Sequence, residues 1–392
     1  LMSQRRGRLE DNDKLERAVD LVQQYYHLAF GALLLGFTLW NRIRPWNNYI
    51  VDGEVLFNGN DAWYHYRSTA YTVRNWPQTM PFDPWTYFPH GTDVGQFGTL
   101  FDQLLATVAL IVGLGSPSDN TVRLVVLFAP AVFALLTGLP TYVIGRRLGG
   151  RAGGVVALAV FALSAGSILQ RSMVGFSDHH IAEVLFQTLG VLGVMVAVTV
   201  ARRDRPVYEQ FLDRDFEGLR STLVWSALAG VAITLYLWVW PFGVLLLGIV
   251  GVYLLFQLTI EFVRGESPEH TAIAGAVALG VTGVLMFIPI TAAEFRVGVF
   301  SLLHPTLAFG VAAGCVFMAW LARFWDDHDI DTVFYPLTIL SVLVVGVVFA
   351  QLATPGIYDL FARNLVRIFG GVLGIGPSET AGTIGEITRM RQ

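Results

Sequence analysis

Carboxylates and imidazoles, the side chains best able to hold a metal ion or move a proton, gather in three short stretches of this sequence. Residues 59–67 read GNDAWYHYR, and His90 follows in YFPHG. Residues 170–183 read QRSMVGFSDHHIAE, and residues 378–389 read SETAGTIGEITR. Because acids and histidines are scarce in the apolar stretches that separate them, we expect the chemistry of the protein to lie in these three stretches.

The Asp-His-His sequence at 178–180 has the spacing of a metal site. In an extended backbone, side chains two positions apart point the same way, so Asp178 and His180 can bind one ion while His179 points elsewhere. Oxygen ligands with a single imidazole suit Mg²⁺ or Mn²⁺ better than Zn²⁺. Asp61 and Glu386 are far away along the chain and would join such a site only through folding.

Each of these groups also has a structural interpretation. Asp-His-His at the start of a helix is most often an N-cap with solvated neighbours, and His65 and His90 lie among aromatic residues, where a hydrogen-bonded structural histidine is usual. The stretch FWDDHDID at 324–331 is denser in possible ligands, but we interpret it as a solvated acidic turn beside a helix end. Trp238 and Trp240 fit an aromatic belt at a membrane interface.

The composition fixes the class of protein that must position these residues. Of 392 residues, 54% are apolar and 14% are charged, and the mean hydropathy is +0.55; soluble domains carry about 25% charged residues. These values exclude a disordered chain, a basic nucleic-acid binder and an ordinary soluble enzyme. Cys315 is the only cysteine, which excludes an intrachain disulfide and a thiolate metal site. The sequence therefore predicts an all-α polytopic membrane protein.

Transmembrane helices need about 20 mainly apolar residues. Nine stretches of the chain satisfy this rule, near 21–40, 124–144, 152–169, 181–200, 223–240, 242–262, 272–290, 299–321 and 334–353. The apolar stretch 104–114 has only eleven residues before Gly115 and Pro117, so we interpret it as an interfacial or re-entrant helix.

Arginines set the predicted orientation of the bundle. If 104–114 does not span and the N-terminus is cytoplasmic, the short cytoplasmic loops hold ten arginines and the short outer loops hold Arg171 and Arg296 alone. The predicted organisation is a cytoplasmic segment 1–20 and a membrane bundle 21–353 that includes an outer loop 41–123. A second outer segment, 354–392, ends the chain. All three chemical stretches then lie on the outer face.

The motifs, in this order, resemble the catalytic subunit of oligosaccharyltransferase in its archaeal form. They are GNDAWYHYR after the first span, YFPHG, R-x6-DHH-x2-E before the fourth span and TIGE after the ninth. Each is weak by itself, but four in the right loops are specific, and the resemblance covers essentially the whole chain. With Lys14 as the only lysine, the composition is similar to that of haloarchaeal members.

The resemblance implies a glycosyltransferase of the GT-C type, with thirteen spans and a C-terminal soluble domain. Such an enzyme is metal-dependent and inverting, and it moves an oligosaccharide from a dolichol-type phosphate or diphosphate to the Asn amide of an N-x-Ser/Thr sequon. Its partners would be the lipid-linked donor, the acceptor polypeptide and membrane lipids, and it would act as a single subunit. On this view the chain is an N-terminal membrane portion that is not competent alone. The glycan, the number of carrier phosphates and the metal stay open.

The resemblance also assigns site residues by motif. Asp61 matches the first acidic motif, Asp178 and His180 match the second, and Glu386 matches the glutamate of TIxE. These four residues would bind Mn²⁺ or Mg²⁺, with Asp61 and Glu386 also serving catalysis.

Further residues are assigned around this acidic core. Arg171 would help to hold the acidic cluster and serve catalysis. Thr383 would line the acceptor peptide, and His90 and His179 would lie near the donor phosphate. The tryptophan-rich motif that reads the sequon, and a basic residue for the donor phosphate from a later span, have no match in this chain.

Other functions were weighed against the same features. Another polyprenyl-phosphate-sugar transferase, acting on lipid or a Ser/Thr hydroxyl, is the nearest alternative, but the TIGE segment and the DHH pair weigh against it. A transporter or flippase would need charged or broken helices near the bilayer midplane, whereas the ionisable groups here gather at span ends. Nothing in the sequence favours a membrane scaffold.

Overall fold

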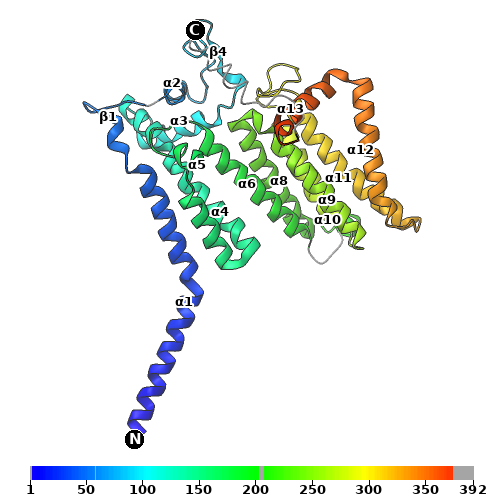
Figure 1. Ribbon diagram of the computed structural model, residues 1–392, viewed down its shortest axis with the longest axis horizontal. Coiled ribbons are helices and arrows are strands. Elements are labelled where there is room, and N and C mark those ends of the chain that lie inside the picture. The colour runs from blue at the N-terminus through cyan, green and yellow to red at the C-terminus, as the bar shows by residue number, and fades with distance from the viewer. Residues whose placement is uncertain (1, 58, 203–206, 374–392) are drawn as a thin grey trace. The chain divides into compact units, whose positions relative to one another are not determined.

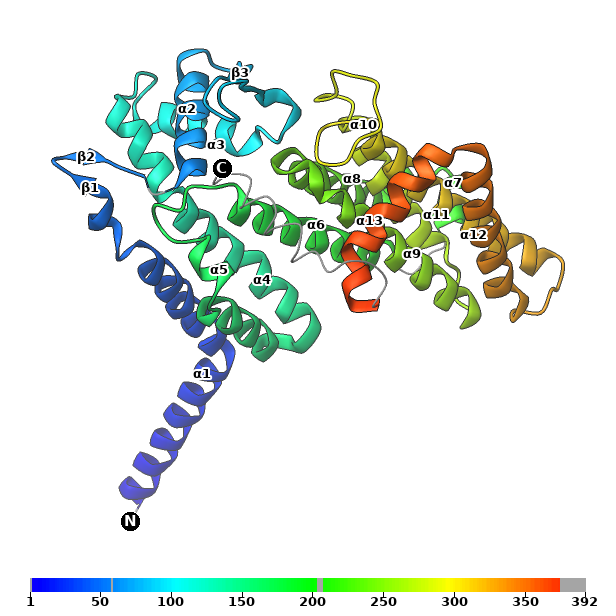
Figure 2. The same cartoon turned by 45° about the horizontal axis from the view of Figure 1, so that its top comes forward.

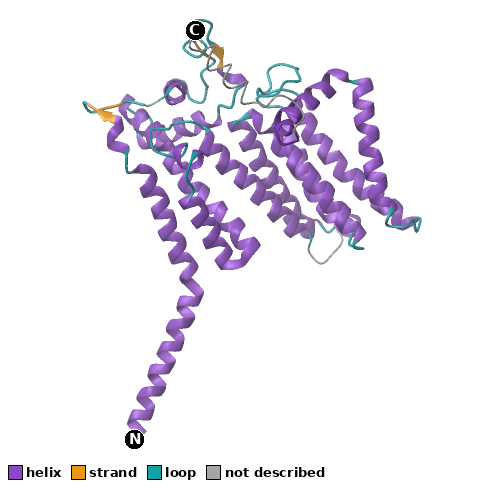
Figure 3. Ribbon diagram, viewed as in Figure 1, coloured by secondary structure: helices purple, strands orange, loops and turns teal. Residues whose placement is uncertain are grey.

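The computed structural model describes residues 2–57, 59–202 and 207–373, and most of them are helical (Figure 3). Two compact units are present: one runs to Phe256 and includes Glu269 to Val316, and the other comprises Gln257 to Pro268 and the chain from Phe317 onward. Two small antiparallel hairpins lie in the first unit. They pair β1 (Ile50–Val51) with β2 (Glu54–Val55), and β3 (Phe82–Asp83) with β4 (Thr92–Asp93).

The described α-helices follow one another along the chain, with longer connections at 44–59, 75–99 and 286–302. They are α1 (Met2–Ile43), α2 (Asn60–Arg74), α3 (Leu100–Val112), α4 (Asp119–Leu163), α5 (Ser167–Gln170), α6 (His180–Ala201), α7 (Val207–Leu212), α8 (Phe216–Val239), α9 (Leu245–Val263), α10 (Glu269–Leu285), α11 (Leu303–Asp327), α12 (Phe334–Ala353) and α13 (Pro355–Leu373). In the first unit α4, α6 and α8 lie side by side, and α2 and α3 cross one end of this layer (Figures 1 and 2).

Six helical segments among the described residues are long and apolar enough to cross a membrane, where the sequence predicts nine spans. Helix α4 contains the predicted span 124–144 and most of the predicted span 152–169, on either side of a break at Gly149 and Gly150; it ends at Leu163. Helix α10 has only 17 residues, and the apolar part of α1 is interrupted by polar residues. The structure is a mostly helical membrane protein with six candidate spans.

Two further stretches have the local structure that the sequence predicts. The apolar stretch 104–114 lies largely within α3, a 13-residue helix that is too short to span, and it begins earlier than predicted, after Thr99. The acidic stretch 324–331 covers the end of α11 and an exposed turn, with Asp326 and Asp329 exposed, in agreement with a solvated turn. The segment predicted as the last outer loop contains α13.

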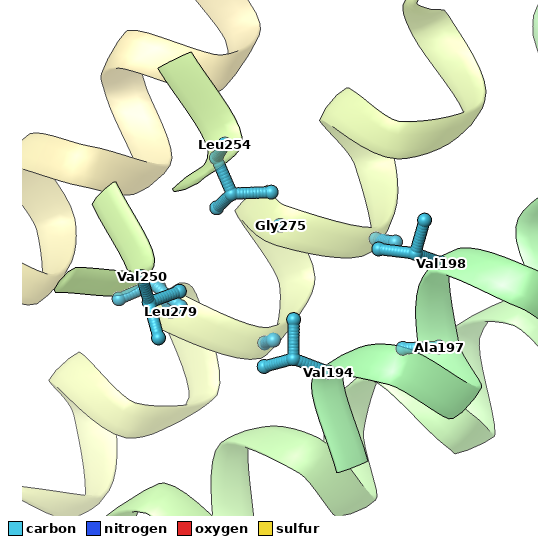
Figure 4. A pocket seen from close by; sticks show the side chains of 9 residues that line it. Val194, Ala197, Val198, Val250, Leu254, Gly275 and Leu279 are labelled. Carbon is cyan, nitrogen blue, oxygen red and sulfur yellow. The ribbon is translucent and has the colours of Figure 1, made fainter. Parts of the chain in front are cut away.

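Much of the interior of the first unit between α6, α8, α9 and α10 is aliphatic. Gly230 of α8 approaches the backbone of α10 so closely that an added Cβ would overlap the carbonyl of Ala278. A small crevice between α6, α9 and α10 is lined by Val194, Val250 and Leu279 among other aliphatic side chains (Figure 4). Because no polar atom of a side chain faces this crevice, it offers no chemistry, and the candidate site lies elsewhere.

Candidate metal centre

The position just before helix α2 has a backbone conformation that favours glycine. Gly59 precedes it with φ +95°, a conformation that glycine adopts without strain. Asp61 lies in the first turn and is exposed, and His65 lies one turn later and is buried. Residues four apart share one face of a helix, so Asp61 lies on the same side of α2 as His65, one turn before it.

The stretch that precedes α6 is tied to two neighbouring helices. The N–H of Val174 donates to the carbonyl of Arg42 (3.0 Å), and the Ser177 hydroxyl donates to the carbonyl of Val126 (2.6 Å). In a regular helix that carbonyl would accept from the residue four positions later, which is Pro130 and has no N–H. The proline in α4 therefore frees the acceptor that fixes Ser177, next to Asp178.

Asp178 is the centre of a cluster of nitrogens. Its Oδ1 accepts from the N–H of His179 (2.7 Å) and lies 3.3 Å from His65 Nε2. Its Oδ2 lies 3.1 Å from His180 Nε2. His180 Nδ1 lies 2.9 Å from Glu183 Oε1, one turn into α6. The structure therefore brings Asp178 and His180 together, as the sequence predicts.

The prediction that His179 points elsewhere is wrong. Its Nδ1 lies 2.7 Å from Asp178 Oδ1, and its ring stacks on Trp240 with centroids 4.3 Å apart. The backbone at His179 is helical (φ −67°, ψ −14°) rather than extended, so the alternation of a strand does not apply there. Trp240 reaches this position because α8 ends at Val239 and the chain turns at Pro241.

Two groups of described side chains have ligand atoms close enough to hold one ion. One comprises His65, Asp178 and His179, and the other comprises His179, His180 and Glu183. The second is partly exposed, whereas His65 and Asp178 in the first are buried.

A buried ion pair lies behind Asp178. His65 Nδ1 lies 2.8 Å from Asp102 Oδ1, and the two side chains are 3% and 0% exposed. Asp102 is in the first turn of α3, where the helix dipole favours a negative charge. Burial by itself lowers the pKa of His65, but the charge and hydrogen bond of Asp102, followed by Asp178, outweigh it and raise this pKa to about 10.

Asp178 is held in its ionised form. Burial raises its pKa, but hydrogen bonds from His179, His180 and His65 act in the opposite direction and hold the pKa well below its usual range. The ionised form is the one in which a carboxylate binds a divalent metal ion.

The other residues that the resemblance assigns are either exposed or outside the described part of the chain. Asp61 is exposed at the start of α2 and belongs to neither metal group in the described part of the chain. Arg171 is exposed and lines a cavity together with His180 and Glu183. His90 lies exposed in the loop between β3 and β4. Glu386 and Thr383 lie outside the described residues.

Four residues of the cluster were not predicted from the sequence as site residues. They are His65, Asp102, Glu183 and Trp240. Two signals existed for the buried pair: a carboxylate in the first turn of an otherwise apolar helix, and a histidine one helical turn after Asp61.

Comparisons with known proteins place this fold in a family. Residues 32–373 match the family described as "Oligosaccharyl transferase STT3, N-terminal". The chain is 50% identical over 351 residues to dolichyl-monophosphooligosaccharide--protein glycotransferase AglB of Haloferax volcanii, which covers 90% of this chain and 33% of that protein. The chain thus spans about a third of the length of this relative.

Solved structures agree with the fold. The archaeal oligosaccharyltransferase AglB from Archaeoglobus fulgidus, in complex with an inhibitory peptide and a dolichol-phosphate, is 25% identical and superposes with a TM-score of 0.73, covering 89% of this chain and 39% of that one. A second structure of an Archaeoglobus fulgidus oligosaccharyltransferase, a complex with Zn and sulfate, is 24% identical with a TM-score of 0.70, covering 83% of this chain and 40% of that one.

Proposed function

Because this chain belongs to the oligosaccharyl transferase STT3 family, we propose that it forms the metal- and donor-binding part of an enzyme that glycosylates asparagine. The enzyme transfers an oligosaccharide from a dolichol-phosphate carrier to the Asn amide of an N-x-Ser/Thr sequon. The Haloferax relative, at 50% identity, is named for a monophosphate carrier, and this favours one phosphate over two.

The arrangement of Asp178 and His180 carries the proposal. Asp178 Oδ2 and His180 Nε2 are 3.1 Å apart, a separation that suits two ligands of one ion bound at about 2.0–2.2 Å from each. One carboxylate oxygen and one imidazole, with further oxygens to be supplied, fit Mn²⁺ or Mg²⁺. Asp61 supports the same site because it shares a helical face with His65, whose ring contacts Asp178.

The acceptor amide is a poor nucleophile, and we assign its activation to two carboxylates, Asp61 and Glu386. Amide resonance opposes rotation about the C–N bond by roughly 18–20 kcal/mol. Asp61 and Glu386, placed to accept both amide N–H bonds, would twist or polarise the amide and free the nitrogen lone pair. Direct attack on the sugar then inverts the configuration at C1, because no sugar–enzyme intermediate is needed.

The donor side requires positive charge near a phosphate. The metal, when bound, would stabilise the negative charge that develops on the leaving phosphate. Arg171, which lines the cavity beside His180 and Glu183, would orient the acidic cluster. His179 and His90 would contact the donor phosphate. Thr383 would contact the acceptor peptide.

The proposed enzyme is a GT-C type bundle with its site on the outer face. The sequence predicts nine spans, and the arginine-rich turns between them would face the cytoplasm. In that orientation Asp61 and Asp178 would lie on the outer side. α3 would then lie at the outer interface.

A peptide-glycosylation assay on the full-length protein in lipid nanodiscs tests the proposal. With lipid-linked donor and an Asn-x-Thr peptide, we expect transfer that chelator abolishes and Mn²⁺ or Mg²⁺ restores. Asp178→Ala and Glu386→Gln should lower turnover at least 100-fold without loss of membrane insertion. Asp326→Ala, which removes an exposed acid outside the site, is the matched control.

Three results would contradict the proposal. These are transfer that resists chelation, wild-type turnover in either variant, and transfer to a Ser/Thr hydroxyl in place of asparagine. The last would favour the related class of polyprenyl-phosphate-sugar transferases.

A further inference from the structure

The two oxygens of Asp178 have unequal surroundings. Oδ1 meets three nitrogens: the N–H of His179 at 2.7 Å, His179 Nδ1 at 2.7 Å and His65 Nε2 at 3.3 Å. Among the described residues, Oδ2 is paired with His180 Nε2 alone, at 3.1 Å. Oδ1 is therefore the oxygen that holds the side chain in place, and Oδ2 is the oxygen available to an ion.

From Oδ1, a series of contacts leads into the interior through His65 to a second carboxylate, that of Asp102. His65 is fixed from behind by Asp102, 2.8 Å from its Nδ1. Asp102 is fully buried, and its Oδ2 has no hydrogen-bond partner in the part of the chain that the structure describes. A carboxylate in such a position is costly, and its pairing with His65 is the interaction that offsets this cost.

The imidazole of His65 is also confined in its plane. Phe101 meets it edge-on with ring centroids 4.9 Å apart, and Tyr64 does the same at 5.0 Å. Phe101 is itself fully buried. With both ring nitrogens paired and two aromatic rings packed against the imidazole, His65 is held with Nε2 toward Asp178.

We propose that His65 and Asp102 are positioning residues of the metal centre. Asp102 anchors His65, and His65 turns Oδ1 of Asp178 inward so that Oδ2 faces His180 and the bound ion. The short helix α3 thereby serves the site, because it supplies Asp102. This inference rests on the metal site of the proposed function and extends it to residues that do not touch the ion.

The competing arrangement makes His65 itself a ligand, together with Asp178 and His179. The unequal surroundings of the two oxygens argue against it, because Oδ1 already accepts from the backbone N–H of His179 and contacts two imidazoles, whereas Oδ2 contacts His180 alone among the described residues. Positioning and direct ligation predict different spectra for a bound ion.

Binding of Mn²⁺ to the full-length protein, followed by electron paramagnetic resonance, is the test. His65→Leu and Asp102→Leu should each weaken Mn²⁺ binding by about 10- to 100-fold, as loss of a residue behind a metal ligand does elsewhere. His65→Gln, whose amide N–H can still donate to Asp178, should recover much of the affinity. Asp102→Asn keeps the volume and removes the charge, and an intermediate loss is expected even if Asp102→Leu does not fold.

Thr72→Val is the matched control. Thr72 is as buried on α2 as His65, and its hydroxyl has no partner among the described residues, so its loss removes a buried polar group away from the cluster. We expect its Mn²⁺ affinity to equal that of the wild type.

The nitrogen couplings of bound Mn²⁺ separate the two arrangements. Under positioning, His65→Gln leaves the number of histidine nitrogens coupled to Mn²⁺ unchanged, because His65 is not a ligand; under direct ligation it loses one nitrogen and keeps that of His179. A smaller number of coupled nitrogens in His65→Gln, or unchanged affinity in His65→Leu and Asp102→Leu, would overturn the inference. These measurements need no glycan transfer, so they fail independently of the proposed activity: a protein that binds Mn²⁺ as described but does not glycosylate peptides contradicts only the latter.

Discussion

At the scale of a single side chain, Asp83 attaches the loop after α2 to that helix. It accepts hydrogen bonds from Arg67 Nη2 (2.6 Å), from the Thr86 hydroxyl (2.6 Å) and from the N–H of Trp85 (3.3 Å). Its side chain is 1% exposed. A loop with little regular structure, in which His90 lies, is thereby attached to α2, the helix that carries Asp61 and His65.

This network predicts a loss of stability in acid. Burial raises the pKa of Asp83, but the hydrogen bonds from Arg67, Thr86 and Trp85 lower it below its ordinary value. A carboxyl whose folded-state pKa is depressed contributes stability above its unfolded pKa, near 4, and that contribution is lost as the pH falls through the folded value. We expect faster hydrogen exchange in the 82–93 hairpin and in α2 as the pH is lowered below about 4, after correction for intrinsic exchange.

Substitution at Asp83 should remove the same contribution at neutral pH. Asp83→Asn should destabilise the hairpin by about 1–2 kcal/mol, since hydrogen bonds to charged groups contribute about 1.5–3 kcal/mol and Arg67 is partly exposed. Asp93→Asn changes an exposed acid in the same hairpin and should have little effect. An acid response that persists unchanged in Asp83→Asn would contradict this assignment.

At the scale of the element, a proline in one helix and a serine before another act as a pair. Pro130 leaves the Val126 carbonyl of α4 without its helical donor, and the Ser177 hydroxyl donates to it. Ser177→Ala should cost about 1–3 kcal/mol, because it leaves a buried carbonyl unpaired. In a Pro130→Ala background the same change should cost less, because the N–H of Ala at position 130 restores the helical bond.

A double-mutant cycle measures this coupling. Thermal unfolding of the wild type, both single variants and the double variant gives the interaction energy. We expect the double variant to be more stable than the sum of the single changes predicts. Strict additivity would show that Ser177 does not depend on the carbonyl that Pro130 frees.

The turn between the two halves of α4 depends on one glycine more than on its neighbour. Gly150 has φ +66° and ψ −161°, whereas Gly149 has φ −133°. An added Cβ would meet no atom within 4 Å at either position, so any difference between them is conformational. Gly150→Ala should lower the unfolding free energy by about 1–3 kcal/mol, and Gly149→Ala should have a clearly smaller effect. Equal losses would mean that the backbone at 150 can relax out of this conformation.

At the scale of the whole molecule, the sequence predicts best what depends on local composition. The length and apolar character of α6, α8 and α12 agree with the predicted spans, and so does the shortness of α3. Nine spans are predicted and six candidates are found in the described part of the chain, for three reasons. Gly149 and Gly150 leave two predicted spans within one helical segment, α10 ends after 17 residues, and the predicted span in α1 is not among the candidates.

The site is predictable only in part, for a physical reason. Asp178 and His180 are neighbours in sequence, so their spacing predicts their proximity. The direction of the His179 side chain depends on the local backbone conformation. That conformation is helical, whereas the prediction requires an extended one. His65 and Asp102 meet Asp178 through packing of α2 and α3 on one end of the α4, α6 and α8 layer, and no sequence pattern encodes that contact.

Membrane orientation is the prediction of widest consequence, because it decides which side of the membrane the candidate metal centre faces. Cys315 is buried, so single cysteines introduced into a Cys315→Ala background report on their own surroundings. Ser116 lies exposed in the turn between α3 and α4, and Leu148, 77% exposed, lies at the break within α4. The first half of α4 separates the two positions. If arginine-rich turns face the cytoplasm, Ser116→Cys in intact cells should react with a membrane-impermeant maleimide, and Leu148→Cys should react only after permeabilisation. The reverse pattern would put Asp178 on the cytoplasmic side, and labelling of both positions in intact cells would show that this part of α4 does not cross the membrane.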